Sequence, residues 1–171
     1  MNRTIEKQVR MALRHPKAAE ELLLQVKNSR IPENCQVTWG ERRVPVSRGR
    51  HHGGYASLFP RQPVLRFESD LERRVLKQFA SVSACIALAT QPVTIRFRFE
   101  GRTRRYTPDV LVILESVPDE WGAAGFQRFT LVEVKPLNFA DDSPRLWSAR
   151  CDAFESTLRI PLVRFPLNGG K

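Results

Sequence analysis

The sequence predicts an α/β protein with one mixed β-sheet flanked by helices, and two kinds of pattern indicate it. Residues 110–114 are a continuous apolar run, which is typical of a strand covered on both faces, and residues 129–135 are expected to form another central strand. Between residues 3 and 28, and again from residue 69, apolar residues recur at helical spacing. A chain of 171 residues is long enough for one ordinary domain with a sizeable core.

The first part of the chain, residues 1–62, is predicted to hold a helical segment followed by a basic arm. The helical pattern over residues 3–28 is interrupted at His15-Pro16, because proline disturbs a continuing helix and restricts the residue before it. Residues 31–62 carry several prolines and glycines and scattered arginines, which indicates an irregular basic segment.

The second part, residues 63–171, is predicted to hold the sheet. Helices are expected to begin near Ser69 and at Ser143, where a serine stands at the N-cap position. Strands are expected at residues 93–99, at the run ending in 109–114, at 129–135 and at 161–165, with a turn at 100–102 and a loop at 116–127. The order helix, three strands, helix, strand predicts the mixed sheet.

Net charge is the most unusual property of the composition, because 28 lysines and arginines outnumber 18 acidic residues and give a formal charge of +10. Such an excess favours nucleic acid as a partner. The alternative is a basic surface, or a basic loop, that meets no polyanion. The predicted DNA-contacting residues are Arg42, Arg43, Arg48, Arg50, His51, Arg104 and Arg105.

The cysteines and the hydropathy pattern bear on the compartment. The three cysteines, Cys35, Cys85 and Cys151, are far apart and form no CxxC pair, so neither disulfides nor a zinc site is indicated. The sequence has no apolar run of membrane length, and its N-terminus does not read as a signal peptide. We therefore expect a protein of the reducing cytoplasm that has no membrane partner.

Acidic residues and one lysine are spaced as in a site for a hard divalent cation. Asp109 follows a proline at the start of one apolar run, and Glu133 stands two residues before Lys135 on the next. Since side chains alternate along a strand, Glu133 and Lys135 share a face. Mg²⁺ takes oxygen ligands and keeps several waters, and Mn²⁺ is expected to substitute for it. The predicted ligands are Glu72, Asp109, Glu133 and the Val134 carbonyl.

These residue types predict hydrolysis of a phosphodiester, because a bound Mg²⁺ ion supplies the attacking hydroxide and relieves the developing charge. Lys135 would orient or deprotonate the attacking water, or neutralise the scissile phosphate. The predicted catalytic residues are Glu72, Asp109, Glu133 and Lys135.

Each acid also has a structural interpretation. Glu133 and Lys135 could form an ion pair on a sheet surface, but the apolar strand around them makes unpaired ions costly. Asp109 alone could begin a turn. Glu72 could complete a capping box by accepting from the Ser69 amide, and Glu68, one helical turn earlier, is an equal candidate for the metal.

These motifs resemble the PD-(D/E)XK nuclease superfamily and, more narrowly, TnsA, the endonuclease subunit of heteromeric cut-and-paste transposases. The resemblance covers most of the chain: Arg43–Tyr55, Ser69–Glu72, Thr107–Asp109, Val134–Pro136 and Arg159–Val163. It implies a restriction-endonuclease-like fold, a nuclease core over residues 63–171, and Glu72 rather than Glu68 as the ligand. TnsA proteins can carry glutamine where this chain has Glu133.

The resemblance also implies partners and a biological role. In that family the subunit nicks the 5′ ends of the transposon, a DDE-type recombinase (TnsB) cuts and joins the 3′ ends, and an AAA+ regulator (TnsC) couples the reaction to a target. A bacterial cytoplasmic protein that acts on the nucleoid is therefore expected. Well-known members carry a C-terminal helical domain that engages the regulator; this sequence stops at Lys171, so we expect either a short variant or partner contacts elsewhere, such as residues 1–30.

Two other functions fit the same residues. A PD-(D/E)XK restriction or repair nuclease would use the same chemistry in another pathway. A catalytically silent DNA-binding or assembly module on the same fold is the alternative that is not an enzyme, and the presence of Asp109, Glu133 and Lys135 argues against it. A recombinase gene and an AAA+ ATPase gene next to this one would favour transposition.

Overall fold

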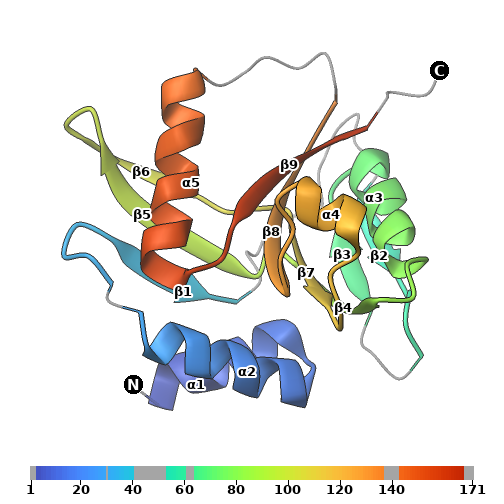
Figure 1. The fold of residues 1–171 in the computed structure, drawn as a ribbon. Coiled ribbons are helices and arrows are strands. Elements are labelled where there is room, and N and C mark those ends of the chain that lie inside the picture. Colours follow the sequence, from blue (N-terminus) through green and yellow to red (C-terminus); the bar gives the residue numbers. More distant parts are fainter. Residues whose placement is uncertain (1–2, 30, 41–52, 61–63, 137–142, 168–171) are drawn as a thin grey trace.

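The computed structural model describes residues 3–29, 31–40, 53–60, 64–136 and 143–167, which form a mixed α/β fold with five helices and three small sheets (Figure 1). The helices are α1 (Arg3–Leu13), α2 (Pro16–Lys27), α3 (Asp70–Ala80), α4 (Asp119–Ala123) and α5 (Pro144–Leu158). The strands are β1 (Gln36–Trp39), β2 (Gly54–Ala56), β3 (Leu65–Phe67), β4 (Cys85–Thr90), β5 (Val93–Phe99), β6 (Arg102–Tyr106), β7 (Val110–Leu114), β8 (Phe129–Pro136) and β9 (Leu162–Leu167).

The prediction of a single sheet is wrong, because the described strands divide among three. The mixed sheet has the order β4-β7-β8-β9, in which only β8 and β9 are parallel. Helix α5 connects these two strands, since a parallel pair needs a long crossover. The other two sheets are antiparallel, with the orders β1-β5-β6 and β2-β3. Strands β1 and β2 lie in the segment that was predicted to be irregular.

A long hairpin, bent in the middle, joins the mixed sheet to the three-stranded sheet. Strand β4 leads into β5 across Gln91-Pro92, and β6 leads into β7 across residues 107–109. The two prolines of these links, Pro92 and Pro108, cannot donate to a strand ladder, which fits a break in pairing here. The sequence predicted one uninterrupted strand ending at residue 114 and did not predict β4.

The mixed sheet is buried on both faces, as the continuous apolar run at 110–114 predicted. All five residues of β7 are buried. We call the buried residues shared with α1, α2 and α5 the first core, which includes Val9, Leu22, Ala89, Ile95, Leu111, Leu131 and Phe154. We call those shared with α3 the second core, which includes Val75, Phe79, Leu88, Val112 and Val132. Each fully buried large apolar side chain contributes about 1.5–3 kcal/mol to folding.

Caps fix the starts of the helices. The Ser69 and Ser143 hydroxyls accept from the backbone amides of Glu72 and Leu146, both at 3.2 Å, so the two predicted N-caps are confirmed. The predicted break at Pro16 is also confirmed, since α1 ends at Leu13 and α2 begins at Pro16. The segment predicted as a loop at 116–127 contains the short helix α4.

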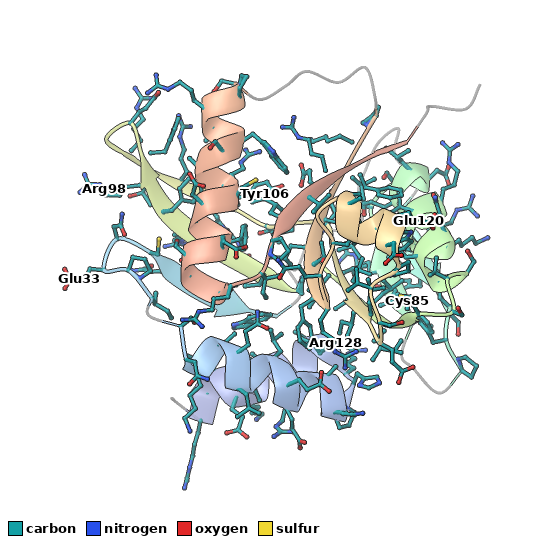
Figure 2. All side chains as sticks on the ribbon, viewed as in Figure 1. Glu33, Cys85, Arg98, Tyr106, Glu120 and Arg128 are labelled. Atoms are coloured by element: carbon teal, nitrogen blue, oxygen red, sulfur yellow. The ribbon has the colours of Figure 1, made fainter. Side chains whose placement is uncertain are left out.

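Helix α2 is joined to the rest of the fold by polar contacts as well as by the first core. The Arg128 guanidinium, just before β8, lies 2.6 Å from the Glu21 carboxylate of α2 (Figure 2). The Gln25 amide donates to the Arg159 carbonyl at 2.6 Å. In the described part of the chain, the helices are all too short or too polar to cross a membrane.

Candidate active site

The acidic residues meet where the bent hairpin leaves the mixed sheet. Asp109 directly precedes β7, and its backbone amide donates to the Val132 carbonyl of β8 at 3.1 Å. Its backbone carbonyl accepts from the Gln91 amide at 2.8 Å, which holds both strands of the hairpin together at the bend. Its carboxylate accepts from the Val134 amide at 2.8 Å. Strand β6 pairs with β5 and not with β8, so it offers no backbone acceptor to the Val134 amide of β8. The Asp109 carboxylate accepts from that amide instead.

Glu133 lies across from Asp109 on the neighbouring strand. The β7–β8 register ends with Val110 paired to Val132, so Asp109 and Glu133 directly adjoin its last pair, and the charge of Glu133 acts on Asp109. The Glu133 carboxylate is buried, and one of its oxygens accepts a short hydrogen bond from the Tyr106 hydroxyl. The other oxygen lies 3.4 Å from the Lys135 ammonium. Glu133 and Lys135 therefore share a face, as strand alternation predicted.

The Asp109 carboxylate is held in surroundings that disfavour its negative charge. Burial raises the pKa of Asp109 to about 8, and the charges of Glu133 and Glu72 add to the rise. The Val134 amide and the Lys135 ammonium oppose the rise but do not cancel it. A pair of close, buried carboxylates with one ammonium lacks positive charge, and a divalent cation would supply it.

The charge of Glu72 acts on Asp109, and the charge of Glu133 acts on Glu72. The Glu72 side chain nevertheless turns toward the start of its own helix. Its carboxylate oxygens accept from the Glu68 amide at 2.9 Å and from the Ser69 hydroxyl at 3.0 Å. The capping interpretation thus describes this side chain, although the amide it binds belongs to Glu68 and not, as predicted, to Ser69. Burial raises the pKa of Glu72, and the charges of Glu68 and Glu133 raise it further.

The described residues fit Mg²⁺ only in part. Within the described ranges, no group of three or more His, Cys, Asp or Glu side chains could hold a metal ion as placed. Asp109 and Glu133 do lie side by side, and Mg²⁺ is commonly bound by one or two carboxylates with waters completing the shell. The N–H and C=O of one strand residue point to the same side, so the Val134 carbonyl faces the side where Asp109 lies.

Two residues of this site were not predicted from the sequence. Tyr106 ends β6 and donates to Glu133, and burial together with the Glu133 charge raises its pKa, so its hydroxyl keeps the proton. The Arg150 guanidinium of α5 lies 4.1 Å from the centre of the Tyr106 ring, and Phe154 packs against the edge of that ring. Figure 2 shows Tyr106 beside α5. An aromatic residue three positions before Asp109, at a strand end, was the available signal.

The predicted DNA-contacting residues have different outcomes. Arg42, Arg43, Arg48, Arg50 and His51 lie outside the described residues. Arg104 and Arg105 are both exposed on β6, but strand alternation sends them to opposite faces. Arg105 pairs with Arg96, whereas Arg104 pairs with the buried Phe97.

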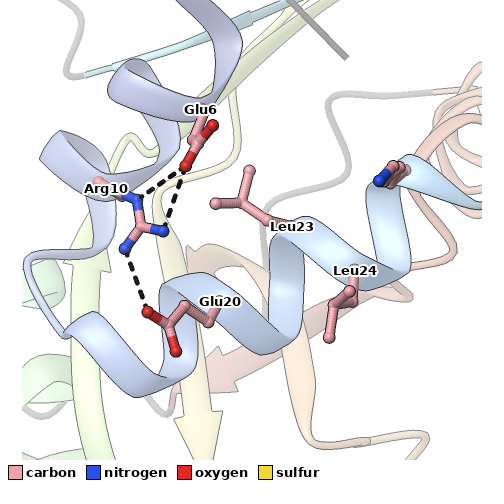
Figure 3. Close-up of a pocket in the computed structure, with 6 residues that line it drawn as sticks. Glu6, Arg10, Glu20, Leu23 and Leu24 are labelled. Carbon is pink, nitrogen blue, oxygen red and sulfur yellow. Dashed lines mark hydrogen bonds and ion pairs between the residues drawn. The ribbon is translucent and has the colours of Figure 1, made fainter. Parts of the chain in front are cut away.

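A surface pocket of about 390 Å³ between α1 and α2 is separate from these acids (Figure 3). It is lined by Glu6, Arg10, Glu20, Leu23, Leu24 and Lys27. Its charges compensate one another, since Arg10 lies 3.2 Å from Glu6 and 3.5 Å from Glu20. We therefore place the candidate site at the hairpin bend and not in this pocket.

Comparison with known proteins adds no family to this description. No protein-family model matches the chain, and no curated protein matches it. A functional conclusion must therefore come from the residues and geometry of this chain.

Proposed function

We propose that this chain is a Mg²⁺-dependent DNA endonuclease with a restriction-endonuclease-like core. The observation that carries the proposal is the meeting of Asp109 and Glu133 from neighbouring strands, with Lys135 beside them, at the bend of the hairpin. In the mixed sheet, β4, β7 and β8 follow α3 in the sequence and are antiparallel neighbours. Helix α5 then leads to β9, which is parallel to β8, and this order supports the fold assignment.

The chain's own residues would divide the work as follows. Asp109 and Glu133 would hold the ion, which when bound supplies an activated water and charge relief at the phosphate. The Val134 amide fixes the Asp109 carboxylate, and the Tyr106 hydroxyl fixes that of Glu133. The Lys135 side chain is 30% exposed, so its ammonium can reach a phosphate or a water arriving from solvent while staying near Glu133.

Within this chemistry, the resemblance to TnsA supports a narrower role. We infer a subunit of a heteromeric transposase that nicks the 5′ ends of a transposon in the bacterial cytoplasm. A TnsB-like recombinase and a TnsC-like AAA+ regulator would be its partners, and Mn²⁺ would replace Mg²⁺. The same site also serves a restriction or repair nuclease, which would cut without those partners.

One observation favours the alternative of a catalytically silent DNA-binding module. The Glu72 carboxylate is engaged at the start of α3, and the acids as placed do not form a group of three. A silent module would bind DNA and leave it intact with every divalent metal.

The test measures nicking of supercoiled plasmid with Mg²⁺ or Mn²⁺, alone and with the recombinase and transposon-end DNA. We expect Asp109→Ala and Lys135→Ala to abolish nicking. Matched controls are Asp119→Ala and Lys77→Ala, which remove the same charges from exposed positions of α4 and α3. Nicking that survives both site substitutions in the complete mixture would show that the assigned site is wrong. Cleavage without partners would favour the restriction or repair role.

A further inference from the structure

The outer face of the three-stranded sheet β1-β5-β6 is a second surface with a definite chemistry. On its inner face, Trp39, Ile95 and Phe97 belong to the first core. Alternation and register place every second residue of these strands on the opposite, outer face. The exposed residues of this outer face are Gln36, Thr38, Arg96, Arg98, Thr103 and Arg105.

These outward side chains are guanidinium groups, hydroxyls and an amide, without a carboxylate among them. Arg96 stands directly across from Arg105. Like charges at directly paired positions destabilise a sheet. Among the described residues, Arg96, Arg98 and Arg105 take part in no ion pair, so their repulsion is not offset within this part of the chain. An anion bound between them would remove that cost.

The spacing favours a nucleic-acid backbone over a single small anion. Arg96 and Arg98 lie two residues apart on one strand, which is about 7 Å. A row of arginines at this spacing meets successive phosphates, and the planar guanidinium binds phosphate oxygens in pairs. Hydroxyl and amide side chains supply the remaining phosphate contacts in protein–DNA interfaces. The tip of the hairpin stands away from the body of the molecule, and Figure 2 shows Arg98 at this projecting end.

The outer face ends beside the bend of the hairpin. Along the chain from β4 to β5, Ala89, Val93 and Ile95 belong to the first core, whereas Leu88 belongs to the second core beneath α3. The outer face thus lies on the α3 side of the hairpin, whereas Glu133 alternates with Val132 and lies on the side of Leu131, in the first core. The Thr94 and Thr107 hydroxyls are hydrogen-bonded at 2.7 Å beside the bend, two residues before Asp109.

We propose that this outer face, through Arg96, Arg98 and Arg105, binds the phosphate backbone of duplex DNA. The choice of DNA rests on the proposed function, but the binding is separate from cleavage. Arg104, which projects from the inner side, is not part of this surface.

The test is fluorescence anisotropy of a labelled DNA duplex with the full chain, across a range of salt concentrations. We expect Arg96→Ala/Arg98→Ala/Arg105→Ala to weaken binding on the order of 100-fold at about 0.15 M salt, and to reduce the slope of log affinity against log salt by about 2–3. The matched control removes three exposed positive charges from α1 and α2: Arg3→Ala/Lys7→Ala/Lys17→Ala. Equal losses in the two triple variants, or an unchanged salt slope, would overturn the proposal.

Further measurements test whether the loss of binding comes from the three charges and whether DNA is the partner. Glutamine at the same three positions retains more of the side chain and a polar end if the alanine variant does not fold, and it should weaken binding in the same way. An RNA duplex or polyglutamate that competes as well as DNA would overturn the choice of partner. If the triple variant loses DNA binding while the wild type does not nick DNA, the proposed nuclease function fails and the docking surface stands.

Discussion

The cluster of charged side chains in the α1–α2 pocket and the cluster at the hairpin bend differ in burial, and this difference separates a surface feature from a candidate site. In the α1–α2 pocket, Arg10 is 41% exposed and bridges Glu6 and Glu20, which are 46% and 64% exposed. At the hairpin bend, the Glu133 side chain is only 7% exposed and shares one ammonium with Asp109.

The physical consequence of burial is large. Exposed ion pairs contribute about 0–1 kcal/mol and are screened by salt. Buried carboxylates that repel one another lose solvation that a single ammonium does not replace, so they persist where a cation or a reaction uses them. The charged residues of the α1–α2 pocket are therefore weaker evidence for a functional site than the buried acids at the hairpin bend.

The largest expected effect is on catalysis. Asp109→Asn keeps an oxygen that can accept from the Val134 amide but removes the charge that would hold the ion. We expect nicking to fall about 10²–10⁴-fold, the equivalent of several kcal/mol of transition-state stabilisation. Glu6→Gln, which removes the same charge from the α1–α2 pocket, should leave nicking unchanged. Plasmid nicking rates under single-turnover conditions measure both, and equal losses would remove the distinction between the clusters.

The burial of Asp109 should also appear in the pH dependence of stability. The pKa of Asp109 in the folded protein, about 8, lies above its ordinary value of 3.8, so the folded state binds a proton more tightly than the unfolded state. This group therefore stabilises the fold below pH 3.8, and its contribution is lost as pH rises from about 4 to about 8. In denaturant titrations without metal, stability should fall less over this window in Asp109→Asn than in the wild type. A parallel pH dependence in both proteins would contradict the assignment.

The side chain of Glu72 provides the next comparison. Glu72→Gln keeps an acceptor for the Glu68 amide, so the helix start should lose only about 0.5–1 kcal/mol. If Glu72 also turns toward the ion, nicking should fall about 10–100-fold, whereas Glu68→Gln should have a smaller effect. Kinetics and thermal unfolding of both variants measure this. Unchanged nicking in Glu72→Gln would leave capping as its only role.

Tyr106 should have a smaller effect, through Glu133. Tyr106→Phe leaves a buried carboxylate oxygen without its donor, which should cost about 1–3 kcal/mol of stability. Because Glu133 is then less well oriented, we expect about tenfold slower nicking and weaker Mn²⁺ binding by calorimetry. The control is Tyr55→Phe, at a tyrosine that is 66% exposed. A loss of stability with normal Mn²⁺ affinity would limit Tyr106 to a structural role.

The elements that the sequence predicted are those fixed by local patterns. The run Val110–Leu114 is apolar throughout because both faces are covered, and the serines at residues 69 and 143 cap helices through contacts within one turn. Strand β4 was not predicted because its alanines, Ala87 and Ala89, carry little strand preference and are buried in the first core, most of which is distant in the sequence.

The site shows the same limit. Alternation alone placed Glu133 and Lys135 on one face, because it acts within a single strand. The contact of Tyr106 with Glu133 depends on the bend at Pro92 and Pro108, which turns β6 away from β8 and toward α5. Side-chain rotation decides whether Glu72 caps its helix or faces the acids, and residue spacing does not report rotation.

The smallest expected effect is in the α1–α2 pocket itself. Glu20→Gln breaks the exposed bridge to Arg10, so we expect the free energy of unfolding to change by about 0.2–1 kcal/mol at low salt and by less at high salt. Denaturant titrations at two salt concentrations measure this. The distance from the acids predicts unchanged nicking and unchanged Mn²⁺ affinity. A large loss of nicking would instead show that this pocket communicates with the hairpin bend through the first core, to which α1 and α2 both contribute.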